Sequence, residues 1–387
     1  MITDNSFCTL PWVNLSTDVN GSLRPCCKFA QPNPENEFQL PNMKDGRLDQ
    51  LWNHVEFQKL RQSFLNGGRP KECQTCWDEE ASGIQSYRQS FLKYRDIKPP
   101  SIFTPITEYS PITVDLKLNN VCNLKCRICG PQASSNFAKE IEERFNVKLE
   151  GSDYWLQNKI IDTENEEIFK SWIPELRHIE MTGGEPMTSP ENLKILHMIG
   201  QSGYAQNISI LINTNGTFVN KKIIDALLKF KHVQICLSID DIYSRLEYQR
   251  YPCDWNTILS NIEQYKEILL TNKNISITLF CTVSNFNIFY LDEYLKWARS
   301  TGIPHYWNIL YYNPWFSIKN LPTAAKTIIN SKYVNDDEFT NLLNFMNLSA
   351  DETLFDQFLN DVNTTDLYRK QSFNDTFPEW AKILKNI

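Results

Sequence analysis

Three cysteines near the middle of the chain have the spacing of a metal-binding loop. Cys122, Cys126 and Cys129 form a C-x3-C-x2-C pattern. Three thiolates on one short loop can hold three irons of a cubane 4Fe-4S cluster, which leaves the fourth iron open to an external ligand. Structural zinc is the simpler alternative, but zinc normally takes four ligands and this loop supplies three. The pattern therefore favours an iron-sulfur cluster with one reactive iron.

A second set of four cysteines lies in the N-terminal region, in the order C-x17-C-x46-C-x2-C. Its members are Cys8, Cys26, Cys73 and Cys76. Four thiolates suit either a fully ligated 4Fe-4S cluster or a structural zinc ion, and the spacing alone does not choose between them. Cys27 is an alternative to its neighbour Cys26 as a ligand, although the turn residue Gly21 five positions earlier favours Cys26.

The elements that must position the triad follow a repeating pattern from residue 112 onward. Short β-rich runs alternate with amphipathic helical stretches, which is typical of a parallel sheet with crossover helices. Six such steps predict an α/β fold built on a partial (β/α)6 TIM-like barrel, and the triad directly follows the first strand. The predicted strands cover 112–118, 178–182, 208–213, 233–239, 275–283 and 306–310, and the helices cover 133–145, 192–202, 221–230, 255–269 and 288–300.

The chain divides into three predicted units. The first, 1–105, is turn-rich, with one helix near 48–64, and it ends in a proline-rich linker that begins at Pro99. The barrel covers 106–320. The third unit, 321–387, is predicted to be a C-terminal helical extension, with amphipathic spacing over 337–346 and 352–359.

Composition excludes several classes of protein. The 387 residues carry a formal charge of -7 without a basic cluster, which argues against a nucleic-acid partner. No apolar run approaches the roughly 18 residues that a membrane span needs. The chain shows no export signal, so its eleven cysteines predict reduced, metal-binding thiols in a cytoplasmic protein.

The triad and a glycine motif together resemble a known family. The sequence Thr182-Gly-Gly-Glu-Pro186 follows the second predicted strand, as the triad follows the first. This combination resembles the radical S-adenosylmethionine (SAM) superfamily over residues 112–312. The resemblance implies that the open iron binds the amino and carboxylate groups of SAM. One electron from the reduced cluster would then cleave SAM to a 5′-deoxyadenosyl radical, which abstracts hydrogen from a substrate.

The resemblance also implies which residues bind SAM. Polar residues end the third and fourth strands, where barrel sites form, and they are candidates for the SAM ribose and carboxylate. An arginine in a later segment would face SAM or substrate, and an isoleucine stands where the family usually has an aromatic residue beside adenine. Strand-ending turns and a surface arginine are the alternative readings. The candidates are Gly183, Gly184, Glu185, Pro186, Asn213, Thr214, Ser238, Arg250 and Ile128.

The N-terminal cysteine module is similar to the twitch domain, a shortened SPASM domain that carries an auxiliary 4Fe-4S cluster. The stretch from Trp77 to Arg88 strengthens this likeness. The module differs in position, because it usually follows the barrel and here it precedes it. The resemblance therefore implies two 4Fe-4S clusters in all. The auxiliary cluster would serve as an electron relay or as a structural clamp.

These features lead to three hypotheses about function. The first is a radical SAM enzyme that abstracts hydrogen from a peptide or protein side chain. The second is a radical SAM dehydrogenase of a sugar-like or aminocyclitol small molecule. The third, from another class, is a non-catalytic scaffold protein whose metal sites are only structural. The expected partners of the enzyme are SAM, the substrate and a reductant such as flavodoxin or ferredoxin.

Overall fold

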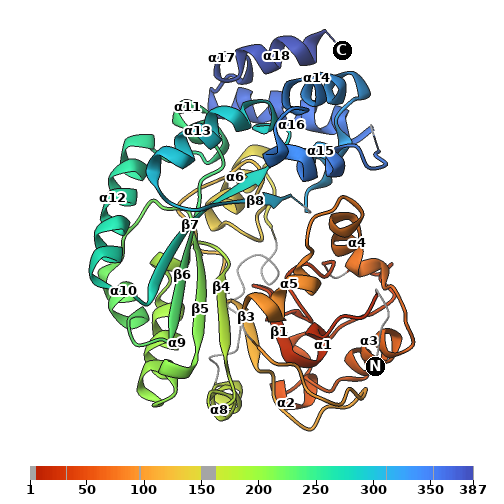
Figure 1. Cartoon of the computed structure of the whole chain (residues 1–387), viewed down its shortest axis with the longest axis vertical. Helices are drawn as coiled ribbons and strands as arrows, with labels where there is room; N and C mark the ends of the chain where they lie inside the picture. Colours follow the sequence, from red (N-terminus) through yellow and green to blue (C-terminus); the bar gives the residue numbers. More distant parts are fainter. Residues whose placement is uncertain are drawn as a thin grey trace.

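A computed structural model describes residues 6–31, 33–95, 97–149, 163–310, 312–351 and 353–386. One eight-stranded sheet lies at its centre, with the strand order β2-β1-β3-β4-β5-β6-β7-β8 (Figure 1). The strands from β1 to β8 pair in parallel, and β2 pairs antiparallel with β1. This arrangement confirms the predicted α/β class and its parallel barrel-like sheet.

The six predicted barrel strands correspond to β3 through β8, each ending within one residue of its predicted bounds. The strands are β1 (Asn14–Thr17), β2 (Leu23–Arg24), β3 (Thr113–Lys117), β4 (His178–Thr182), β5 (Ser209–Thr214), β6 (His232–Ser238), β7 (Ile275–Val283) and β8 (His305–Ile309).

Helices connect and flank these strands. Those before β3 are α1 (Leu10–Val13), η1 (Met43–Asp45), α2 (Leu48–Leu51), α3 (Val55–Leu65), η2 (Lys71–Cys73), α4 (Gln74–Ala81) and α5 (Tyr87–Tyr94). Those among the barrel strands are α6 (Ser135–Phe145), α8 (Thr163–Trp172), η4 (Pro186–Thr188), α9 (Pro190–Gln201), η5 (Ala205–Asn207), α10 (Lys221–Leu227), α11 (Tyr243–Gln249), α12 (Trp255–Thr271), η6 (Ile288–Tyr290) and α13 (Leu291–Thr301). Those after β8 are η7 (Pro314–Phe316), η8 (Ile318–Asn320), α14 (Thr323–Tyr333), η9 (Asp337–Phe339), α15 (Thr340–Met346), α16 (Thr353–Arg369), α17 (Phe373–Thr376) and α18 (Pro378–Lys385).

The two faces of the sheet differ in chemistry because side chains alternate along each strand. Apolar residues such as Ile179, Ile210 and Ile235 are fully buried on the face that α9, α10 and α12 cover (Figure 1). The opposite, concave face is largely polar. In register, Asp115 lies beside Glu180 there. The fold therefore places hydrogen-bonding groups inside the curve of the sheet.

The N-terminal module is more regular than the sequence predicts. Its strand β1 extends the barrel sheet, with Leu15 paired to Val114. All four residues of β1 are buried, so the alternation that would reveal a strand is missing from the sequence. The predicted helix over 48–64 is wrong as a single element. It splits into α2 and α3, because His54 caps α3 by accepting a hydrogen bond from the Glu56 backbone.

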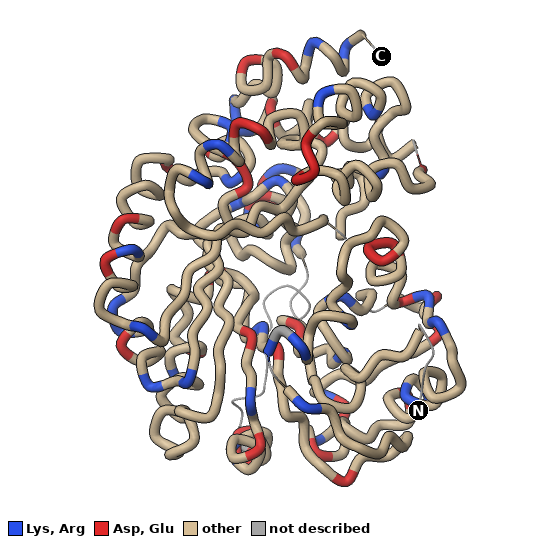
Figure 2. Tube along the Cα trace, viewed as in Figure 1, with Lys and Arg blue, Asp and Glu red and all other residues tan. Residues whose placement is uncertain are grey.

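The module contacts the first barrel strand and a segment that follows the last one. Its strand β1 pairs with β3, and Asp78 of α4 forms an ion pair of 2.7 Å with Lys319 of η8, which follows β8 in the chain. Tyr87 of α5 donates a hydrogen bond of 3.0 Å to Glu180 on the concave face of β4. Figure 2 shows acidic and basic residues meeting where β3, β4 and α5 come together. The module therefore spans the open side of the partial barrel.

The C-terminal helices α14 to α18 lie together at the top of the view in Figure 1. The predicted helix over 352–359 is part of the much longer α16, and 337–346 forms η9 and α15. Among the described residues, no helix combines the length and apolar character needed to cross a membrane.

Candidate active site

The triad lies on the loop that follows β3, and backbone contacts hold this loop in place. Lys125 N–H donates to the Tyr251 carbonyl at 2.6 Å, and Arg127 N–H donates to the Gln249 carbonyl at 2.8 Å. These two alternating bonds resemble a short strand pairing, so they fix the middle of the loop. The loop consequently presents its cysteines at the carboxyl edge of the sheet, where sites of parallel sheets form.

The three thiols gather with nitrogen donors around them. The Cys129 thiol hydrogen-bonds to the Cys126 sulfur, which lowers the pKa of Cys126 and raises that of Cys129. Asn215 Nδ2 lies 3.9 Å from the Cys122 sulfur, and Arg250 Nη1 lies 4.0 Å from the Cys126 sulfur. Burial raises the pKa of Cys122 to about 12. The triad has two buried thiols, those of Cys122 and Cys126, each with an N–H donor near its sulfur, and the partly buried thiol of Cys129. This donor set fits an iron-sulfur cluster.

The two glycines of the Gly-Gly-Glu-Pro motif serve the loop itself. A Cβ on Gly184 would lie 2.2 Å from the Val121 carbonyl oxygen, and one on Gly183, where φ is +112°, would lie 2.8 Å from the Asn119 carbonyl oxygen. Glycine alone avoids both clashes. The close approach that the sequence predicts therefore occurs, but its partner is the backbone of the loop that carries the triad.

Glu185 and Thr214 face each other. Glu185 is 1% exposed, and its carboxylate accepts hydrogen bonds from the Thr214 hydroxyl at 2.6 Å, Asn215 N–H at 2.7 Å and Met187 N–H at 2.9 Å. These bonds join the ends of β4 and β5. Glu185 and Thr214 therefore fix the ends of β4 and β5 relative to each other. Pro186 begins the short helix η4, which follows Glu185 directly.

The remaining predicted SAM residues lie near the triad or on the concave face. Arg250 is buried, and its Nε donates to Asp240 at 2.7 Å, while its other end approaches Cys126. Among the described residues, no partner meets the buried Oδ1 of Asn213 on β5. Ser238 ends β6 on the same face as Asn213. The Ile128 side chain is buried, and its carbonyl accepts a hydrogen bond from the side chain of Asn313.

The four module cysteines also come together, although they are far apart in the sequence. Cys8, Cys73 and Cys76 each lie close enough to Cys26 for their charges to raise its pKa, after the larger effect of burial. Burial likewise raises the pKa of Cys8 to about 12. Metal binding would displace the thiol protons, and four gathered thiols fit a fully ligated cluster or zinc.

The Cys27 thiol lies beside acidic side chains of the barrel strands. The Cys27 sulfur and carboxylate oxygens of Asp115 and Glu180 all lie within 4.8 Å of one another. Burial, followed by the charges of Asp115 and Glu180, raises the pKa of Cys27 to about 12. This group is not among the sites predicted from the sequence. The available signal was an acidic residue between two apolar neighbours in each strand, Asp115 in β3 and Glu180 in β4.

The charges around this second group argue against another metal ion. Arg95 forms an ion pair with Glu180, and Lys117 lowers the pKa of Asp115 against the larger effect of burial. Burial still raises the pKa of Asp115 to about 6. Cations from the chain already compensate both carboxylates, so the group suits proton exchange or contact with a polar molecule better than metal binding.

Comparison with known proteins assigns the two regions. Residues 116–298 match the sequence model of the radical SAM superfamily, and residues 8–77 match that of the SPASM iron-sulfur cluster-binding domain. An uncharacterized protein of Methanocaldococcus jannaschii is 26% identical over 190 residues, which cover 49% of this chain and 58% of that protein.

Two solved structures show a limited similarity to this chain. Native anSMEcpe with bound AdoMet is 18% identical, with a TM-score of 0.40, and the match covers 58% of this chain and 61% of that one. Streptococcus suis SuiB bound to the precursor peptide SuiA is 14% identical, with a TM-score of 0.41, and the match covers 76% of this chain and 62% of SuiB. The matches thus span less than two thirds of each relative.

A parallel sheet with three thiols after its first barrel strand, joined to a module that gathers four more, defines an α/β protein built for iron-sulfur clusters. The sequence matches narrow this class. The chain carries a radical SAM domain over residues 116–298 and a SPASM iron-sulfur cluster-binding domain over residues 8–77. Radical SAM domains bind a 4Fe-4S cluster and SAM, and SPASM domains bind additional iron-sulfur clusters.

Proposed function

We propose that this protein cleaves SAM reductively and abstracts a hydrogen atom from a bound substrate. One observation carries the proposal. The thiols of Cys122, Cys126 and Cys129 share one loop at the carboxyl edge of the sheet, and N–H groups of Asn215 and Arg250 face two of their sulfur atoms. Three ligands leave one iron of a cubane cluster for SAM.

In this proposal the chain supplies binding and orientation. When bound, the cluster and SAM together supply the one-electron cleavage and the radical that accepts hydrogen. Asn213, Ser238 and Arg250 are the side chains proposed to contact SAM, and Ile128 contributes an apolar surface for its adenine. Glu185 acts as a positioning residue, since its carboxylate is already engaged by the end of β5.

The module is proposed to hold a second 4Fe-4S cluster through Cys8, Cys26, Cys73 and Cys76. With all four irons ligated, this cluster supplies an electron acceptor or a structural clamp and leaves no iron for substrate. An oxidised product also requires a proton to leave the substrate. Asp115 is placed to accept it, because burial holds its pKa at about 6.

We propose a peptide or protein side chain as the substrate, with reduced flavodoxin or ferredoxin as the electron donor. The SPASM match supports the peptide class, since the resemblance places such modules in peptide-modifying enzymes as well as in dehydrogenases. A sugar-like polyol is the second candidate. The polar concave face favours it, because Asn213, Ser238 and the acidic pair beside Cys27 can hydrogen-bond hydroxyl groups.

The test begins with anaerobic reconstitution of the full chain, which should bind about eight irons as two cubane clusters. Dithionite and SAM should then yield 5′-deoxyadenosine. The variant with Cys122, Cys126 and Cys129 all replaced by alanine should form none while keeping its module cluster. Formation of 5′-deoxyadenosine by that variant, or its absence from the parent protein, contradicts the proposal.

A second measurement separates the two substrate classes. The reduced protein and SAM are incubated with short peptides encoded beside its gene and, separately, with polyols. A peptide that loses two hydrogen atoms by mass spectrometry supports the first class. A polyol oxidised to a carbonyl compound supports the second.

A further inference from the structure

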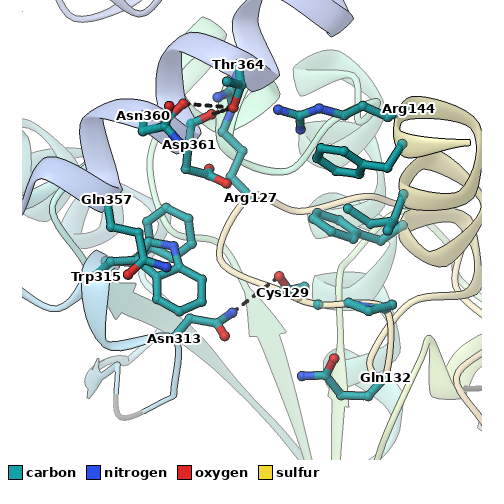
Figure 3. A pocket seen from close by; sticks show the side chains of 16 residues that line it. Arg127, Cys129, Gln132, Arg144, Asn313, Trp315, Gln357, Asn360, Asp361 and Thr364 are labelled. Atoms are coloured by element: carbon teal, nitrogen blue, oxygen red, sulfur yellow. Dashed lines mark hydrogen bonds between the residues drawn. The ribbon is translucent and has the colours of Figure 1, made fainter. Parts of the chain in front are cut away.

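A cleft of about 320 Å³ lies beside the cluster loop, between α6, η7 and α16 (Figure 3). One wall carries Phe137 and Phe145 from α6, and the other carries Trp315 and residues of α16. Cys129 forms part of the floor. Apart from the cluster ligand Cys129, the lining among the described residues includes none of the side chains proposed above to contact SAM. The volume falls in the range of small-molecule sites.

Two residues that line the cleft each carry a buried N–H group that lacks an acceptor among the described residues. These groups are Nη1 of Arg127 and Nε1 of Trp315. Arg127 is 2% exposed, and its other nitrogens are engaged: Nη2 donates to Asp366 and Gln371, and Nε donates to the Tyr248 carbonyl. A buried donor without an acceptor is costly, so these two atoms call for an acceptor supplied by a ligand.

The cleft also has a charged pair of opposite sign. Arg144 from α6 and Asp361 from α16 both line it, and Arg144 Nη1 donates to Thr365 at 3.0 Å. Burial raises the pKa of Asp361, and the charges of Arg127 and Arg144 oppose that effect. A ligand cation would stabilise the ionised carboxylate further. The walls therefore suit a molecule with one negative group, one positive group and a flat apolar body.

We propose that this cleft binds a free aromatic α-amino acid. Its carboxylate accepts from Arg127 Nη1 and Trp315 Nε1, its ammonium meets Asp361, and its ring lies between the phenylalanines of α6 and the Trp315 indole. The proposed radical chemistry does not require this site. A ligand there touches the cluster loop from the side that carries α6 and α16.

The first experiment is calorimetric titration of the anaerobically reconstituted full chain with L-phenylalanine and L-tryptophan. Three controls each remove one group: 3-phenylpropanoate lacks the ammonium, 2-phenylethylamine lacks the carboxylate and L-leucine lacks the ring. Each control should bind at least tenfold more weakly than the aromatic amino acids. Equal binding of L-leucine overturns the ring contact, and no saturable binding up to about 10 mM overturns the site.

Variants then test the named contacts. Trp315→Phe keeps a ring but removes the indole donor and should weaken L-phenylalanine binding about fivefold. Trp255→Phe is the matched control, because Trp255 Nε1 is also buried without a partner among the described residues and does not line the cleft. Equal losses in the two variants overturn the Trp315 contact.

Asp361→Asn separates recognition from a purely structural effect. It should weaken L-phenylalanine about tenfold and leave 3-phenylpropanoate unchanged, because only the amino acid carries the ammonium. Equal weakening of both ligands overturns the proposed orientation. Saturating SAM should leave the affinity unchanged, and competition by SAM would make the cleft part of the SAM site and end the proposal. Failure of SAM cleavage with normal amino-acid binding would count against the proposed function alone.

Discussion

The triad and the module cysteines both gather thiols for a candidate metal site, but they differ in how far apart these thiols are in the sequence. The triad occupies residues 122–129 of one loop, whereas the module cysteines span residues 8–76 and come from three places in the chain. The local set needs the fold only to place and orient the loop. The distant set exists only when the module is folded, so metal binding and folding are linked there. The triad therefore needs the fold to position one loop, whereas the module site needs the fold to bring distant cysteines together.

The two sets of cysteines also differ in which parts of the chain surround them. The triad receives side-chain donors from the carboxyl ends of β5 and from the segment after α11, through Asn215 and Arg250. These elements come from other barrel steps, so the triad is tied to the carboxyl edge of the sheet. The module thiols affect mainly one another and residues of their own module, as Cys26 does. This contrast makes separate loss of the two clusters the sharpest test.

The largest expected effect is loss of one cluster without loss of the other. The double variant Cys73→Ala, Cys76→Ala should fall from about eight irons to about four, because two thiolates cannot hold a cubane. It should still form 5′-deoxyadenosine from SAM within about twofold of the parent and should lose substrate turnover if the module cluster accepts an electron. Iron analysis and product assays measure both.

Cys253→Ala is the control for this variant, since Cys253 is buried without ligand spacing and should keep all its iron. A double variant that unfolds, seen by circular dichroism, favours the structural clamp over the relay. Full substrate turnover by a folded variant that lacks the module cluster excludes the relay.

The next test compares two adjacent residues. Cys26→Ala should lose the module cluster, whereas Cys27→Ala should keep it. The charges of Cys76, Cys73 and Cys8 act on Cys26, whereas the largest charges acting on Cys27 are those of Asp115 and Glu180. Iron content and the electron paramagnetic resonance spectrum of the reduced protein distinguish the variants. Retention of all iron by Cys26→Ala would reverse the ligand assignment.

The sequence was sufficient for the parts whose determinants are local. The predicted ends of β4 and β7 agree with the observed ones, because both are short β-rich runs bounded by turns. The triad and the Gly-Gly motif were visible for the same reason, since their residues are close together in the chain. By contrast, β1 was missed because its partner β3 lies about a hundred residues away and its four residues are all buried.

The partners of side chains were beyond what spacing can reveal. Glu185 was expected to face SAM, but its carboxylate joins the ends of β4 and β5. The sequence favours Cys26 over Cys27 only through its spacing from Gly21, and the packing of the module against the concave face gives the two cysteines different neighbours. Both cases depend on long-range contacts that no local pattern records.

A smaller effect is expected where the C-terminal helices hold the triad loop. Asp366 of α16 pairs with Arg127 of the loop and accepts a hydrogen bond of 2.7 Å from the Tyr248 hydroxyl. Asp366→Ala leaves the Arg127 charge uncompensated in a buried position and should lower the free energy of unfolding by about 2–3 kcal/mol.

The same variant should bind less iron at the triad and normal iron in the module, because only the triad loop contacts α16 through this pair. Asp225→Asn is the control, since the exposed Lys221 and Asp225 pair should contribute less than about 0.5 kcal/mol. Urea unfolding measures the energies. Equal loss of iron at both sites would show that the two regions are not independent.

The smallest effect concerns the junction of the two regions, where Asp115 lies beside Cys27. Burial raises the pKa of Asp115 from 3.8 to about 6. A carboxyl group with a raised folded-state pKa stabilises the fold fully below its unfolded pKa, and that contribution is lost as the pH rises through the folded pKa. Between pH 5 and pH 7.5 the parent protein should therefore lose about 1 kcal/mol of stability relative to Asp115→Asn, since one pKa unit corresponds to about 1.4 kcal/mol. Urea unfolding of both proteins at the two pH values, with Asp225→Asn as background, measures the difference. A difference of the opposite sign would mean that Lys117 outweighs burial, and the junction would then hold its carboxylate ionised and unable to accept a proton from substrate.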